Sequence, residues 1–151
     1  MALPEIADLI ADSADELVRV WVVAVRADEG ILSDDDLTEG GLIDHVPVMI
    51  EEVSDALRTG RRPTCENINE ARVHAYTRFR QGYRARDLVR ESSHLRLILL
   101  DHLHEKLGGE AWGEAPAAGY HEAARVINQY LDEELCYGVS IYTEELTNLK
   151  S

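Results

Sequence analysis

The sequence predicts an all-α fold, a single-domain bundle of four or five helices with a long C-terminal helix. Apolar residues recur at spacings of three and four along most of the chain, which places them on one face of a helix. No stretch shows the sustained apolar–polar alternation of a half-buried strand. A length of 151 residues fits one domain with one core, so we expect residues 1–151 to fold as one unit.

The first helix is predicted from about Pro4 to Ala27, where Asp28, Glu29 and Gly30 end it. Seven residues at helical spacing are expected on its buried side: Ile6, Leu9, Ile10, Leu17, Val20, Trp21 and Val25.

The second helix is predicted to begin near Leu42 and to stop at Gly60. Pro47 is expected to lie in its first turn or to kink it. Its apolar stripe is formed by Val46, Ile50, Val53 and Leu57.

The third and fourth helices are predicted over about 66–81 and 85–107, joined at a tight corner. Gly82 can take the left-handed conformation that such a corner needs. The fourth helix is apolar nearly all round at its centre, so we expect it to be buried on several sides. Its apolar residues include Leu88, Leu95, Ile98, Leu99 and Leu103.

The last helix, predicted over about 117–149, is too long for a domain of this size. Its apolar residues approach the heptad spacing of a coiled coil. We therefore predict that this helix extends from the bundle, pairs with a second copy and carries the output. The predicted seam comprises Ile127, Leu131, Leu135, Val139, Tyr142 and Leu146, with Leu149 at its end.

Polar residues that share faces of the third and fourth helices form the candidate binding site. His74, Arg78 and Gln81 follow one another at i, i+4 and i+7. The fourth helix adds Glu91, His94 and Arg96 soon after the corner. Two interpretations stay open: a polar network that only clamps the corner, or a site for a small ligand between the helices.

No cofactor, metal or catalytic residue is predicted. Glu91-x-x-His94 supplies one half of the pattern that carboxylate-bridged di-iron bundles use on two helices. A haem would need a proximal histidine, for which His74 and His94 are the candidates, but Phe79 is the only phenylalanine available to a haem pocket. A haem- or metal-binding sensor and a small helical enzyme remain the alternatives, although no Gly-rich loop or nucleophile elbow is present.

The composition argues against nucleic acid and membrane as partners. A net charge of −14 repels both polyanions and anionic lipid. No apolar run approaches the length that spans a bilayer, and the first residues are acidic where a signal peptide is basic. Two cysteines are too few for a disulfide framework. We expect a soluble cytoplasmic protein.

Three groups of residues along the chain combine into one larger pattern. The first group is a Leu-x-Asp-His-x-Pro start, here Leu42, Asp44, His45 and Pro47. The second combines a histidine, an arginine and a Gln-Gly-aromatic element, here His74, Arg78, Gln81, Gly82 and Tyr83. The third is a Leu-x-x-Glu-x-x-x-Leu-Arg element, here Leu88, Glu91, Leu95 and Arg96.

Together these groups resemble the N-terminal domain of RsbT co-antagonist (RsbRD) proteins, found in stressosome regulators and ahead of bacterial histidine kinases. This resemblance implies a non-catalytic sensory module with globin-like or bundle-like helical packing, usually without a bound cofactor. It implies that the chain passes a signal to an effector, either an attached histidine kinase of a two-component system or a separate regulator. It also fits a homodimer, because the last helix is similar to the segment that leads into the dimerisation helices of a kinase.

Overall fold

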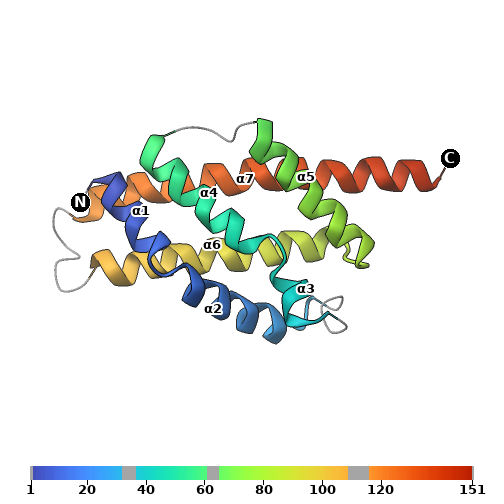
Figure 1. Cartoon of the computed structure of the whole chain (residues 1–151), viewed down its shortest axis with the longest axis horizontal. Coiled ribbons are helices and arrows are strands. Elements are labelled where there is room, and N and C mark those ends of the chain that lie inside the picture. The colour runs from blue at the N-terminus through green and yellow to red at the C-terminus, as the bar shows by residue number, and fades with distance from the viewer. Residues whose placement is uncertain (1, 32–36, 61–64, 109–115, 151) are drawn as a thin grey trace.

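A computed structural model describes residues 2–31, 37–60, 65–108 and 116–150 of the chain. Within these ranges it contains seven helices and no strand. They are α1 (Leu3–Ala11), α2 (Ala14–Ala27), α3 (Glu39–Ile43), α4 (Val46–Thr59), α5 (Cys65–Arg80), α6 (Ala85–Gly108) and α7 (Pro116–Leu149). The helices pack around one core, and α7 spans the whole length of the bundle (Figure 1). The predicted all-α domain with a long C-terminal helix is confirmed.

The prediction of one N-terminal helix is wrong: the helix breaks at Asp12 and Ser13, so that α1 and α2 are separate helices. Short polar side chains at these positions favour helix ends over helix interiors. The break re-aims the chain so that α1 packs mainly on α4 and α2 packs on α6. Val20, on α2 after this break, is 46% exposed, whereas the sequence predicted it on the buried side.

The segment before α4 differs from the prediction of a helix that begins near Leu42. The short helix α3 is capped by Thr38, whose Oγ1 accepts a hydrogen bond from the amide of Gly41 (3.1 Å). The chain then turns at Asp44, which has a φ of 39°, a conformation that non-glycine residues rarely adopt. Pro47 lies in the first turn of α4, as predicted, because its missing N–H has no helical partner there.

The corner between α5 and α6 forms where the sequence predicts it. Gly82 has a φ of 88°, which a side chain would disfavour. The backbone N–H of Arg84 donates to the Asp87 carboxylate (3.0 Å), which closes the first turn of α6. The two helices therefore leave the corner with a defined register.

Helix α7 packs against α5, α6 and α4 and completes the core. Its C-terminal end continues past the other helices (Figure 1). The largest apolar side chains with almost no exposure are Trp21, Ile6, Ile10, Leu42, Ile50, Leu57, Leu95, Leu99, Leu103, Ile127 and Leu131. No helix in the described ranges has the length and apolar character needed to cross a bilayer.

Candidate functional site

A buried arginine organises the polar residues near the α5–α6 corner. Arg78, on α5, is fully buried, and its Nε donates to Oε1 of Glu91 on α6 (2.9 Å). Its Nη1 donates to the carbonyl of Gly41 (3.0 Å) and to Oε1 of Gln81 (2.8 Å). Its Nη2 donates to the carbonyl of Leu42. One guanidinium thus joins α3, α5 and α6, and its charge is compensated by hydrogen bonds on every nitrogen.

His74 lies one turn before Arg78 and faces two carboxylates. Its Nδ1 is 3.0 Å from Oδ2 of Asp44, and its Nε2 is 3.2 Å from Oε1 of Glu91. Burial lowers the pKa of His74, but the carboxylates of Asp44 and Glu91 outweigh this effect, so the net shift is upward. The same contact lowers the pKa of Asp44. Asp44, His74, Arg78, Gln81 and Glu91 are called the Arg78 network below.

The Arg78 network also reaches α2 and borders a small cavity. The indole N–H of Trp21 donates to the backbone carbonyl of Glu91 (3.1 Å). The cavity beside His74 and Glu91 has a volume of about 30 Å³. A space of this size holds about two water molecules, whereas pockets for small organic ligands start at roughly 300 Å³. In this conformation the cavity is too small for a haem or another organic ligand.

Two of the six predicted site residues lie outside the Arg78 network. Nε2 of His94 lies 2.7 Å from Oδ2 of Asp28, and Oδ1 of Asp28 accepts from Nη2 of Arg90 (2.6 Å). Arg90 first and His94 second hold the pKa of Asp28 well below its usual range. Arg96 bonds instead to Asn128 and Asp132 on α7. The predicted set therefore divides among three places, each of which joins two or more helices.

The predicted seam of α7 is divided between the core and the surface. Ile127, Leu131 and Tyr142 are buried within the chain itself, and Leu135 and Val139 are half-buried. Leu146 is 49% exposed and Leu149 is 73% exposed. Ile127, Leu131 and Tyr142 therefore fill the core of their own chain, whereas the other apolar residues of the predicted seam keep part or most of their surface exposed.

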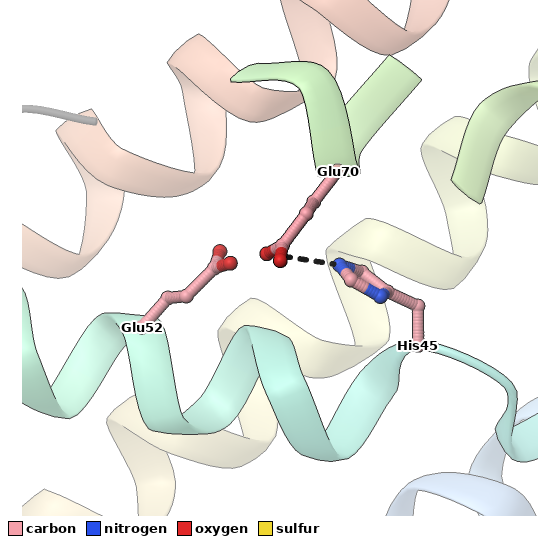
Figure 2. A group of neighbouring side chains, drawn as sticks. All are labelled: His45, Glu52 and Glu70. Carbon is pink, nitrogen blue, oxygen red and sulfur yellow. Dashed lines mark ion pairs between the residues drawn. The ribbon is translucent and has the colours of Figure 1, made fainter. Parts of the chain in front are cut away.

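A second cluster comprises His45, Glu52, Glu70 and Glu134 and is called the His45 cluster below. His45 caps α4, Glu52 lies further along α4, and Glu70 lies on α5, so that the three side chains point toward one another (Figure 2). Glu134, on α7, is 5% exposed and Glu52 is 8% exposed. The hydroxyl of Tyr130 donates to Oε2 of Glu52 (2.7 Å).

The glutamates of the His45 cluster have raised pKa values, because they are buried or partly buried and lie close to one another. Burial raises the pKa of Glu52 to about 7, and the neighbouring carboxylate of Glu134 contributes. The carboxylate of Glu52 raises the pKa of Glu70, and burial raises the pKa of Glu134. Burial lowers the pKa of His45, which favours a neutral imidazole.

Sequence reasoning did not single out the His45 cluster as a site. His45 entered only through the family resemblance, and the three glutamates come from three different helices. The spacing of His45 and Glu52 indicates one face of one helix, but no spacing rule connects that face to Glu70 or Glu134. The sequence held only a weak signal for this cluster. Its glutamates stand at positions where the neighbouring apolar pattern predicts the buried side of a helix.

Together, the fold and these sites define an all-α bundle in which buried polar side chains form networks between helices. The chain belongs to the family described as the RsbT co-antagonist protein rsbRD N-terminal domain, whose model matches residues 15–150. It is therefore a regulatory signalling domain of the stressosome type. Among the curated proteins and the solved structures compared with it, none matches the chain.

Proposed function

We propose that the chain is a non-catalytic signal-input domain that acts as a homodimer and passes its signal through α7 to an effector. The effector is a histidine kinase module or a separate signalling partner. The observation that carries this proposal is the course of α7, which is part of the core over most of its length and then ends in exposed Leu146 and Leu149. One rigid element thus connects the interior to a surface suited to a second chain.

The contacts of α5 support a route from the Arg78 network to this surface. His74 and Arg78 lie on α5, which packs extensively against α7. Arg72, also on α5, forms an ion pair with Glu144 near the end of α7 (3.0 Å). A signal that shifts α5 would therefore change the position or rotation of the end of α7. Small shifts of packed helices of this kind are a common switching motion in proteins.

The state of the charged groups supports a non-catalytic role. Both ring nitrogens of His74 face carboxylates, and every guanidinium nitrogen of Arg78 is hydrogen-bonded. A general base needs a free acceptor within reach of a substrate, and the adjoining cavity has room for about two waters. These residues hold helices together and do not present a reactive group to a cleft.

Dimerisation through the end of α7 is tested by light scattering on the full chain at tens of micromolar. We expect the wild type to be a dimer and Leu146→Glu to be a monomer, because a buried charge at the contact opposes association. Val23→Glu is the matched control, since Val23 is 69% exposed on α2, which packs mainly against α6, α4 and α3. A monomeric wild type, or a Leu146→Glu variant as dimeric as the control, would rule out this dimer.

A further inference from the structure

The His45 cluster combines an imidazole with carboxylates in a geometry close to that of a metal site. One ligand atom from each of His45, Glu52 and Glu70 can be chosen so that all lie within 4.8 Å of one another. Nε2 of His45 lies 4.0 Å from Oε2 of Glu70 (Figure 2). Neighbouring ligands of a tetrahedral metal ion are about 3.4 Å apart, from bonds of about 2.1 Å. Small side-chain rotations would therefore bring these atoms into coordination distance.

Several buried polar atoms of the cluster lack a hydrogen-bond partner. Both carboxylate oxygens of Glu134 and Oε1 of Glu52 are buried without a hydrogen bond in the described part of the chain, as is Nε2 of His45. The hydroxyl of Tyr130 gives its one proton to Glu52. Within the described ranges, no lysine or arginine forms an ion pair with a glutamate of the cluster. Burial of unpaired carboxylates is costly, and a cation among them would offset that cost.

We propose that the cluster binds one divalent first-row transition-metal ion, for which Zn²⁺ and Mn²⁺ are suitable, through four side chains: His45, Glu52, Glu70 and Glu134. Imidazole nitrogen together with carboxylate oxygen suits these ions. Ca²⁺ and Mg²⁺ prefer oxygen ligands alone, so the imidazole selects against them. His45 directly follows the turn at Asp44 and is the N-cap residue of α4.

A bound ion would connect three helices. The ligands come from α4, α5 and α7, so that coordination would tie the output helix to the other two. The ring of His45 also stacks on that of His74, with 5.7 Å between centroids, which places the ion beside the Arg78 network. An effect of metal on output rests on the proposed function, whereas metal binding itself does not.

Calorimetric titration of the full chain, first stripped with a chelator, tests the proposal directly. We expect one Zn²⁺ or Mn²⁺ to bind per chain, and Mg²⁺ to bind at least tenfold more weakly. Glu52→Gln and Glu134→Gln should each weaken Zn²⁺ binding at least tenfold. Glu51→Gln is the matched control, because Glu51 is exposed on the same helix. Absence of Zn²⁺ and Mn²⁺ binding would overturn the proposal and would mean that shared protons hold the carboxylates of the cluster together. An equal loss of Zn²⁺ affinity in Glu51→Gln would also overturn it.

A measurement on the wild type alone covers the case in which a variant fails to fold. Substoichiometric Mn²⁺ broadens the NMR signals of nearby nuclei, and the imidazole signals of separate histidines can be followed together. We expect His45 and then His74 to broaden first, with His121, which is exposed on α7, unaffected. Broadening that begins at His121 or His94 would place the ion elsewhere and overturn the proposal.

Discussion

At the scale of single residues, the interior of this domain depends on charges whose partners come from other helices. Arg78 is completely buried, yet each of its guanidinium nitrogens has an acceptor. Such an arrangement contributes less to stability than its number of contacts suggests, because burial of the charges offsets much of the attraction. Removal of one partner is strongly destabilising, because it leaves a buried charge without compensation.

Arg78→Met is expected to lower the free energy of unfolding by about 3 kcal/mol, within the range for breaking a buried ion pair. Glu91 would lose its closest cationic partner, and the carbonyls of Gly41 and Leu42 would lose donors. Urea denaturation followed by circular dichroism measures the change. Arg80→Met, at an exposed position of the same helix, should change it by less than about 0.5 kcal/mol. Equal losses in the two variants would contradict the assigned burial of Arg78.

Asp28 makes stability depend on acid pH. Arg90, His94 and the amide of Gly30 all face its carboxylate, and they lower its pKa below the usual 3.8. The unfolded chain therefore takes up the proton more readily. The stabilisation is complete above about pH 4 and is lost as the pH falls below that value.

Asp28→Asn should cost about 1 to 2 kcal/mol at pH 7, and this difference from the wild type should shrink between pH 4 and pH 2. Urea midpoints at pH 7, 4, 3 and 2 measure it. Asp101→Asn, at an exposed position of α6, is expected to follow the wild type throughout. A difference between Asp28→Asn and the wild type that stays constant with pH would show that the carboxylate charge is not what stabilises this contact.

At the scale of elements, α7 comes close to α5 and α6 at Gly138. A Cβ added at Gly138 would lie 3.4 Å from Ala75 Cβ and from Leu88 Cδ2. Glycine disfavours a helix interior, so its presence here has a packing reason. At this point α7 therefore lies in van der Waals contact with α5 and α6.

Gly138→Leu is expected to lower the free energy of unfolding by about 2 kcal/mol, because a larger side chain in a packed contact forces the helices apart. Thermal melting of the full chain measures the effect. Ser140→Leu, exposed on the same helix, should leave the melting temperature nearly unchanged. Equal melting temperatures for the two variants would show that the helices have room at Gly138.

At the scale of the whole molecule, the interior networks and the end of α7 are expected to respond together. A spin label at Asn148, with both native cysteines replaced by serine, reports the distance between the two copies in the proposed dimer. Glu91→Gln weakens the Arg78 network without changing the side-chain shape, so the distance distribution should shift or broaden. Glu105→Gln, exposed on α6, should leave it unchanged. If folded Glu91→Gln and the wild type gave the same distance distribution, the Arg78 network would have no effect on the end of α7.

Local signals were sufficient for much of the fold. Pro47 and Gly60 mark the start and the end of α4, and Gly82 marks the corner. Proline fixes its own φ, and glycine permits the positive φ found at Gly60 and Gly82. The spacing of His74 and Arg78 likewise placed both on one face of α5. The break at Asp12 and Ser13 was missed, since the apolar pattern continues through it and short polar residues also occur within helices.

The sequence alone determined that the chain is helical, where most of its helices lie and which residues share a face. Only the tertiary structure decided that the first residues of the α7 seam fill the core, and that glutamates from α4, α5 and α7 meet beside His45. The physical reason is that helical periodicity relates residues within one helix. Which faces of different helices meet depends on packing across the entire core.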